Sequence, residues 1–235
     1  MLSFQPMQPP WEELEPASQG AYQRQRQAVR DVSQFSGVVF VAAIAVVMLH
    51  TITHISSSLS APGSLSDIAR AAWPALATVL LSLLVLFTLW LLHHIQMRYL
   101  TQLDGTMLLL HVALFSATIL LSVSAACMNA LGSTRDAVVL FAGNTLAIQA
   151  LLLLIWRHAV RGGLLFGSDV PSSVVARLRL LLQIGTISAV AVVGLSYAGA
   201  GVGIGALTAV FLIQILLLAR GGYTLSLRRN AGRLT

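Results

Sequence analysis

Long runs of apolar residues recur along the chain, and shorter polar connectors separate them. Six of these runs approach the ~20 residues that a helix needs to cross a hydrocarbon core roughly 30 Å thick. They cover residues 37–55, 73–92, 107–127, 137–156, 180–197 and 201–218. No acidic residue lies inside any of them. The pattern predicts an all-α polytopic membrane protein with six transmembrane helices in one bundle.

The connectors indicate how the predicted helices follow one another. Only residues 96–106 separate the second and third runs, and only residues 198–200 separate the last two, so these neighbours are expected to form antiparallel hairpins. Pro74 is expected in the first turn of the second helix, where its missing N–H costs nothing. Residues 1–29, rich in Gln, Pro and Glu, are expected to be disordered or partly helical.

Composition excludes a water-soluble domain and sets the orientation. Hydrophobic residues make up 57% of the 235 positions and charged residues 9%, against about 25% charged in typical soluble domains. All fourteen basic residues are arginines, and twelve fall on one side of the predicted topology. Because Arg in short loops stays on the cytoplasmic side, both termini are predicted to be cytoplasmic. These arginines flank apolar runs and form no basic face, so nucleic-acid binding is disfavoured.

The chain lacks the groups that an intramembrane enzyme needs. All five aspartates lie at the ends of the runs or in loops, at Asp31, Asp67, Asp104, Asp136 and Asp169. Neither H-E-x-x-H nor G-x-S-x-G occurs. The sequence therefore predicts that the protein is not an enzyme and that it uses no cofactor.

The histidines do not predict a metal site. His93 and His94 are adjacent, and consecutive helical side chains diverge by about 100°, so they cannot readily bind one ion. His50 and His54 share a helix face, which leaves a metal pair or a pH sensor open, but no third ligand is visible. His111 lies well inside the third run and is expected to face the bundle interior with a partner.

One stripe of the first predicted helix suggests a sharper hypothesis. Ala42, Val46, Leu49 and Thr53 recur at helical spacing. Such a stripe usually contacts the core or lipid. In a symmetric oligomer with this helix at the axis, however, it would form rings of apolar side chains that gate a pore by excluding water.

Three groups of residues resemble one known family. Arg30, four spacers and Phe35-Ser36-Gly37 open the first helix, and the second contains Trp73-Pro74, Ser82 and Trp90-Leu91-Leu92-His93-His94. The third begins with Asp104 and Met107-Leu108-Leu109-Leu110-His111. Together these segments resemble the bacterial form of the transmembrane protein 175 family of potassium channels. That family has Arg, three spacers and Phe-Ser-Asp, then Trp-Pro, Ser-Phe and Trp-x-x-His, and usually Asn where His111 stands.

The resemblance implies a passive cation channel, with potassium as the ion, in an oligomer that is expected to be a homotetramer. Residues 30–220 would be the channel domain and residues 221–235 a basic cytoplasmic tail. The first helices would surround the pore, with the constriction at Ala42, Val46 and Leu49 and the gate at the last two. The chain would then lie in the lipid bilayer of a prokaryotic inner membrane. A non-conducting membrane scaffold and a secondary transporter remain alternatives.

The sequence departs from the family pattern at the first helix. Gly37 replaces the Asp of the hallmark, Arg30 is displaced by one residue, and Ala42 replaces a bulky Ile at the expected narrowest ring. The resemblance implies that a network couples the first helix to its neighbours, and it assigns this role to Arg30, Phe35, Ser36, Trp90, His93, His94 and His111. Because the Asp is missing, we expect Ser36, His94 and His111 to form a neutral network.

Overall fold

The computed structural model describes residues 16–59, 65–131, 134–164 and 172–231, and this part of the chain forms six α-helices. Their bounds are α1 (Pro16–Leu59), α2 (Leu65–Met97), α3 (Gly105–Ala130), α4 (Arg135–Arg161), α5 (Ser172–Ser196) and α6 (Ala200–Ala231). All six are long and apolar enough to cross a membrane. The predicted all-α fold with six membrane-spanning helices is therefore confirmed.

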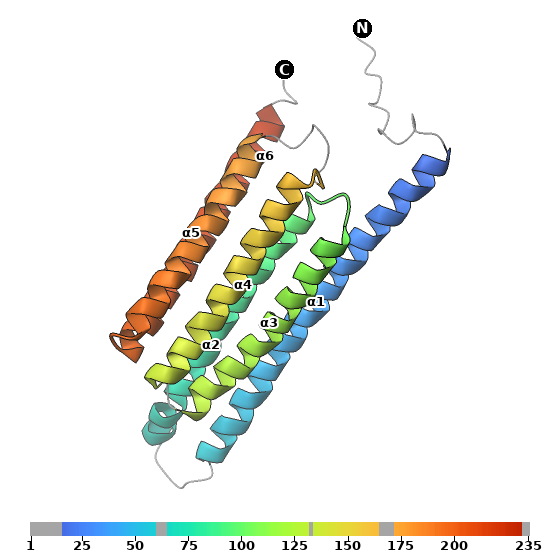
Figure 1. Cartoon of the computed structure of the whole chain (residues 1–235). Coiled ribbons are helices and arrows are strands. Elements are labelled where there is room, and N and C mark those ends of the chain that lie inside the picture. Colours follow the sequence, from blue (N-terminus) through green and yellow to red (C-terminus); the bar gives the residue numbers. More distant parts are fainter. Residues whose placement is uncertain (1–15, 60–64, 132–133, 165–171, 232–235) are drawn as a thin grey trace.

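The helices run side by side as a bundle in which α1 and α5 occupy opposite edges (Figure 1). Among the described residues, α1 packs only on α2 and α3, and α5 packs only on α4 and α6. Helices α2 and α4 lie between these edges and each contacts four other helices. The first described residues of α1 and the last of α6 lie at the same end of the bundle. An even number of crossings requires that arrangement.

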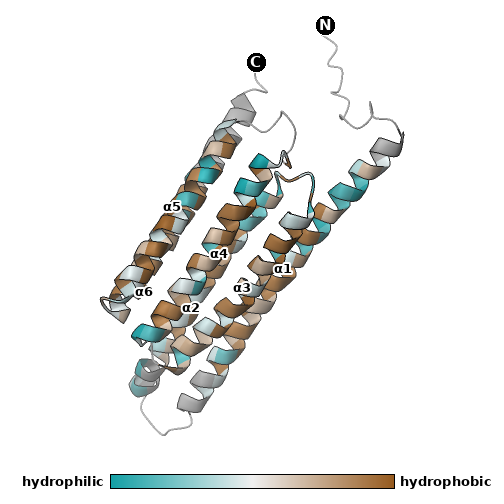
Figure 2. Ribbon diagram, in the orientation of Figure 1, coloured by the Kyte–Doolittle hydropathy of each residue, from teal (hydrophilic) through white to brown (hydrophobic). Residues whose placement is uncertain are grey.

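Apolar side chains cover the outside of the bundle as well as its core. Figure 2 shows hydrophobic residues along the middle of the helices and hydrophilic ones at the start of α1 and near helix ends. Large exposed side chains such as Leu109 and Ile187, each 69% exposed, would be unfavourable in water but are favourable against lipid. The lateral surface is thus suited to a hydrocarbon environment.

Three helices, α1, α2 and α5, begin at least eight residues earlier than the apolar runs indicate. Helix α1 has 44 residues, about 66 Å at 1.5 Å per residue, and continues well beyond the apolar run at its N-terminal end. Helix α2 begins at Leu65, so Pro74 lies inside the helix. The expectation that Pro74 marks its first turn was wrong. The polar residues preceding the apolar run continue the helix, and the ring of Pro74 removes a single backbone hydrogen bond near that end.

Polar side chains inside the bundle are tied mostly to backbone carbonyls. Ser122 of α3 donates to the carbonyl of Ala43 in α1 at 3.1 Å, and Asn129 donates to the hydroxyl of Thr51 at 3.1 Å. Gln96 donates to the carbonyl of Leu152 at 3.0 Å and so joins α2 to α4. Bonds of this kind fix the register between helices where no water is available.

A buried pair of amides joins the second half of the bundle. Gln149 of α4 donates to Oε1 of Gln214 in α6 at 3.2 Å, and both side chains are buried. Gly185 of α5 faces this pair so closely that a Cβ atom there would lie 2.8 Å from Oε1 of Gln149. Only glycine lets α5 approach the two amides.

The α5–α6 hairpin depends on a second close approach. A Cβ atom on Gly203 would lie 3.0 Å from the backbone Cα of Ser196 and would also meet its hydroxyl, whereas one on Gly205 would meet nothing within 4 Å. We expect Gly203→Ala to destabilise the protein by about 1–3 kcal/mol through overpacking. Gly205→Ala is the control and should be neutral, or stabilising by up to about 1 kcal/mol, because alanine favours helix. Thermal unfolding in detergent would measure both; equal melting temperatures would contradict the packing described.

Candidate functional site

Helix α1 is divided lengthwise into a packed half and an exposed half. Val39, Phe40, Ala43, Val47 and Thr51 face α2 and α3 and are buried. The predicted constriction residues are on the other half. Ala42 is exposed, Val46 is 50% exposed and Leu49 is 64% exposed. Within the described part of the chain, this half of α1 is largely exposed and available to lipid or to another copy of the chain.

The exposed half of α1 has no side chain that would bind an ion by charge. Between residues 36 and 53 the helix contains no Asp, Glu, Lys or Arg. The hydroxyl of Thr53, at the end of the stripe, donates to the carbonyl of His50 at 2.7 Å. The stripe thus presents methyl groups, and any selectivity that it produces would come from excluding water rather than from ligating the ion. His50 is half-buried, and the side chain of His54 lies outside the described residues.

Behind the packed half of α1, rings from three helices form a cluster. His93 of α2 and His111 of α3 have ring centroids 5.3 Å apart, and Phe115 lies 6.2 Å and 6.0 Å from them. Helix α1 contributes Phe40, 6.4 Å from His93, and Phe35, which meets Phe115 edge-on at 5.4 Å. Ring contacts therefore couple α1 to both of its neighbours.

The two central histidines differ in their hydrogen bonding. His111 is buried, and its Nδ1 lies 2.7 Å from the carbonyl oxygen of Met107 while its Nε2 lies 3.3 Å from the sulfur of Met97. The prediction that His111 faces the interior with a partner is confirmed. His93 is fully buried, and within the described part of the chain neither of its ring nitrogens has a hydrogen-bond partner.

The expected hydrogen-bonded network of Ser36, His94 and His111 does not form among the described residues. Ser36 donates to the carbonyl of Ser33 in its own helix at 2.7 Å. His94 stacks on Trp90, with centroids 5.4 Å apart and planes inclined by 23°. His94 follows His93 by about 100° around the helix, so it points away from the cluster that His93 joins. Aromatic packing replaces the polar network expected at this position.

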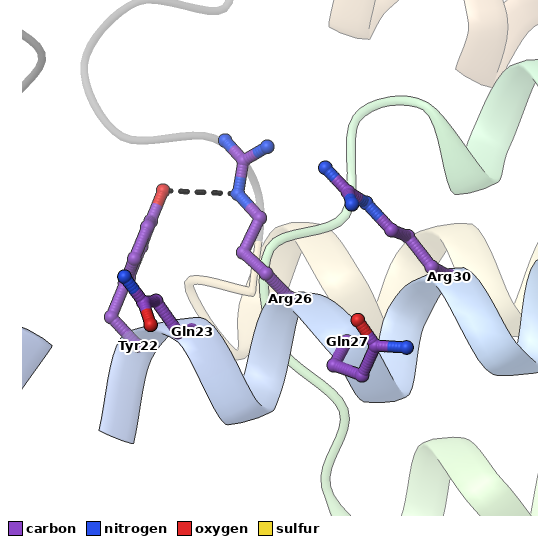
Figure 3. A pocket seen from close by; sticks show the side chains of 5 residues that line it. All are labelled: Tyr22, Gln23, Arg26, Gln27 and Arg30. Carbon is purple, nitrogen blue, oxygen red and sulfur yellow. Dashed lines mark hydrogen bonds between the residues drawn. The ribbon is translucent and has the colours of Figure 1, made fainter. Parts of the chain in front are cut away.

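Arg30 lies apart from the ring cluster. Its side chain is exposed and lines a shallow hollow with Tyr22, Gln23, Arg26 and Gln27 on the first turns of α1 (Figure 3). Arg26 donates from Nε to the hydroxyl of Tyr22 at 3.1 Å. The hollow is formed by one helix face, so the structure places Arg30 on the surface and gives it no contact with His93 or His111.

The loop that follows α2 is tied to the end of α4. Thr101 donates from both its backbone N–H and its hydroxyl to the carbonyl of Leu164, at 3.0 and 3.1 Å. Asp104 caps α3 by accepting from the N–H of Met107 at 2.7 Å, and its second oxygen lies 2.7 Å from Nε2 of His158. The backbone N–H of Met107 and then His158 hold the pKa of Asp104 below its ordinary value.

Sequence reasoning missed Met97 and Phe115 as neighbours of His93 and His111. Met97 follows His93 by four residues and Phe115 follows His111 by four, so each shares a helix face with its histidine. Within each helix, that spacing could have predicted which residue lies beside the histidine. The pairing of His93 with His111 depends on how α2 and α3 are aligned, which a single sequence does not reveal.

Comparisons with known proteins agree with the fold and with the family resemblance. No family model matches the chain. A potassium channel of Streptomyces collinus is 26% identical over 173 residues, which cover 72% of this chain and 82% of that protein. The crystal structure of a Chamaesiphon minutus homologue of the lysosomal potassium-selective channel TMEM175 superposes with a TM-score of 0.68. It has 18% identity and covers 83% of this chain and 98% of the other. The predicted resemblance is confirmed, and the chain is a multi-pass membrane protein with this fold.

Asp104 should contribute stability in a pH-dependent way. Since its folded pKa is depressed, its contribution is full above the ordinary pKa of an aspartate and disappears as the pH falls through the lower folded value. We expect Asp104→Ala to lower the melting temperature at about pH 6, with a smaller deficit near pH 3. Asp104→Asn retains a side chain that can cap α3, so it should lower the melting temperature less than Asp104→Ala does. A deficit that stays constant with pH would contradict a role for the charge.

Proposed function

We propose that the chain is the subunit of a potassium channel in which α1 lines a central pore. The main support is that α1 lies at the edge of the protomer and has an exposed apolar half. The fold of the protomer also matches that of a homologue of a potassium-selective channel. The name of the Streptomyces collinus relative supports the same ion. Conduction would be passive, because the six apolar runs contain no acidic residue that could serve as a proton or cation carrier.

The constriction is assigned to Ala42, Val46 and Leu49. These residues lie on one line of the exposed half, so equivalent residues of several subunits would form successive apolar rings around a shared axis. Ala42 leaves its ring wider than the others, and Val46 and Leu49 are therefore the proposed gate. A neck of methyl groups holds water poorly, and an ion must lose part of its hydration to pass it.

The remaining assignments follow from this arrangement. The arginine distribution supports cytoplasmic positions for both termini. The bacterial relative supports the inner membrane of a prokaryote as the location. Residues 30–220 would form the channel domain, with segments 1–29 and 221–235 on the cytoplasmic side. The chain would have no enzymatic activity, consistent with its relatives being named as channels.

Substitutions along α1 can distinguish a pore from a lipid-facing stripe. We expect Val46→Ser or Leu49→Ser to let water into the neck and lower the barrier to ions by at least about 1 kcal/mol, roughly a fivefold faster passage. The ratio of potassium to sodium flux should fall as well. Flux from proteoliposomes containing purified protein measures both quantities.

The matched control is Val41→Ser. Val41 is 66% exposed on the same helix but lies about 140° around the axis from Val46. Its replacement should leave selectivity unchanged, whereas Val47→Ser, at a buried position, should lower stability. If Val46→Ser and Val41→Ser change the flux equally, or if the unsubstituted protein carries no flux, α1 does not line a pore and the scaffold reading gains support.

The oligomer is proposed to be a homotetramer. Four α1 helices can close around a narrow axis, with each chain presenting the same exposed half. Native mass spectrometry should therefore give four chains of 25.0 kDa, or 100 kDa of protein. A monomer that nevertheless conducts would contradict both the tetramer and the pore of α1 helices.

A further inference from the structure

The ring cluster behind α1 contains three side chains with the chemistry of soft-metal ligands. His93, His111 and Met97 are all buried, with 0%, 1% and 4% of their surface exposed. Two of them come from α2 and one from α3. We propose that imidazole nitrogens of His93 and His111 and the thioether sulfur of Met97 bind one monovalent copper ion.

The distances from His111 to each of the other two side chains fit a shared ion. Bonds of about 2.0 Å to imidazole nitrogen and 2.3 Å to sulfur, meeting at about 100–110°, place the two ligand atoms roughly 3.3–3.5 Å apart. Nε2 of His111 lies 3.3 Å from the sulfur of Met97. The centroids of the two imidazole rings are 5.3 Å apart, which is the separation of two imidazoles that converge on one metal at a similar angle.

The orientation of His111 is that of a metal ligand. Its Nδ1 lies 2.7 Å from the carbonyl oxygen of Met107, and a carbonyl can only accept, so Nδ1 carries the proton. Nε2 is then unprotonated and directs its lone pair toward Met97. A backbone carbonyl holding the far nitrogen of a histidine is the usual support for a histidine that binds metal.

The ring nitrogens of His93 are available to bind an ion. Its side chain is fully buried, yet within the described residues no donor or acceptor partners either ring nitrogen. A buried polar group left without a partner destabilises the fold, and a bond to a metal ion would remove that penalty. Gly37 has no side chain to offer, and Ser36 is engaged with Ser33, so α1 provides no alternative partner.

The surroundings favour Cu(I) over harder or divalent ions. The site has two imidazoles, a thioether and aromatic neighbours such as Phe115 and Phe40, and the ring contacts and hydrogen bonds described for these residues involve no carboxylate. Thioether sulfur selects Cu(I), whereas Mg²⁺ and Ca²⁺ require oxygen ligands. A single positive charge also costs less to bury than a double one. Met97 is the last residue of α2, so entry would be beside the loop that follows it.

Copper binding can be tested on the full chain in detergent. Cu(I) would be titrated under reducing, anaerobic conditions against a colorimetric chelator, and Ag(I), which needs no reductant, would serve as a second probe. The unsubstituted protein should bind one ion per chain. X-ray absorption of the copper-loaded protein should show two nitrogen neighbours and one sulfur neighbour.

Substitutions at the site provide the decisive comparison. Met97→Leu keeps the volume and removes the sulfur, and we expect it to weaken Cu(I) and Ag(I) binding at least about tenfold. His93→Gln should weaken binding similarly. Met128→Leu, which removes another buried thioether of the bundle, and His94→Gln, which removes the adjacent histidine, should leave the affinity unchanged. Melting temperatures without metal verify that all four variants fold.

Three results would overturn the proposal. The first is that the unsubstituted protein binds much less than one ion per chain. The second is Cu(I) affinity that Met97→Leu and His93→Gln leave unchanged, which would place the ion at other residues. The third is tighter binding of Zn(II) than of Cu(I) with no effect of Met97→Leu, which would exclude the thioether. Because these measurements require no ion flux, failure of the channel proposal would leave them unaffected.

Discussion

The structure depends on the rule that a polar group in hydrocarbon must find its partner inside the protein. On α1 this rule separates two halves. The hydroxyls of Ser36 and Thr51 and the carbonyl of Ala43 lie on the packed half, where Ser33, Val47, Asn129 and Ser122 satisfy them. The opposite half contains mainly methyl and methylene groups. Such a helix stays packed against its own protomer while it presents an apolar surface to lipid or to another copy of the chain.

The same rule bears on the ring cluster behind α1. Because Gly37 has no side chain, a charged or hydrogen-bonded histidine at position 93 would have no partner at that position of α1. The chain fills the space with Phe35, Phe40 and Phe115 and adds a second imidazole at position 111. Coupling between α1 and its neighbours then rests on packing, which tolerates small relative shifts better than a directional ion pair does.

Much of the fold could be predicted from the sequence because its determinants are local. Six apolar runs of membrane length suffice to define six helices, and the short connectors after the second and fifth make them hairpins. The exposed stripe at Ala42, Val46 and Leu49 was also predictable from helical spacing. The start of α2 was not, since Pro74 resembles a first-turn proline until the preceding polar residues are known to be helical. The contact of His93 with His111 could not be predicted, because it depends on the alignment of α2 with α3, and the expected neutral network included His94 rather than His93.

Both edge helices have an exposed apolar half, and in the proposed channel the two halves would adjoin different surroundings. The exposed half of α5 contains large side chains such as Leu180 and Ile187 together with the small residues Ala191 and Gly194. The exposed half of α1 includes Ala42 and Ala45 between its branched residues, and small side chains let helices of neighbouring protomers approach closely. Helix α5 is also held through Gly185 against the buried amide pair of α4 and α6. In the proposed channel the exposed half of α1 would face the common axis, and the exposed half of α5 would contact lipid.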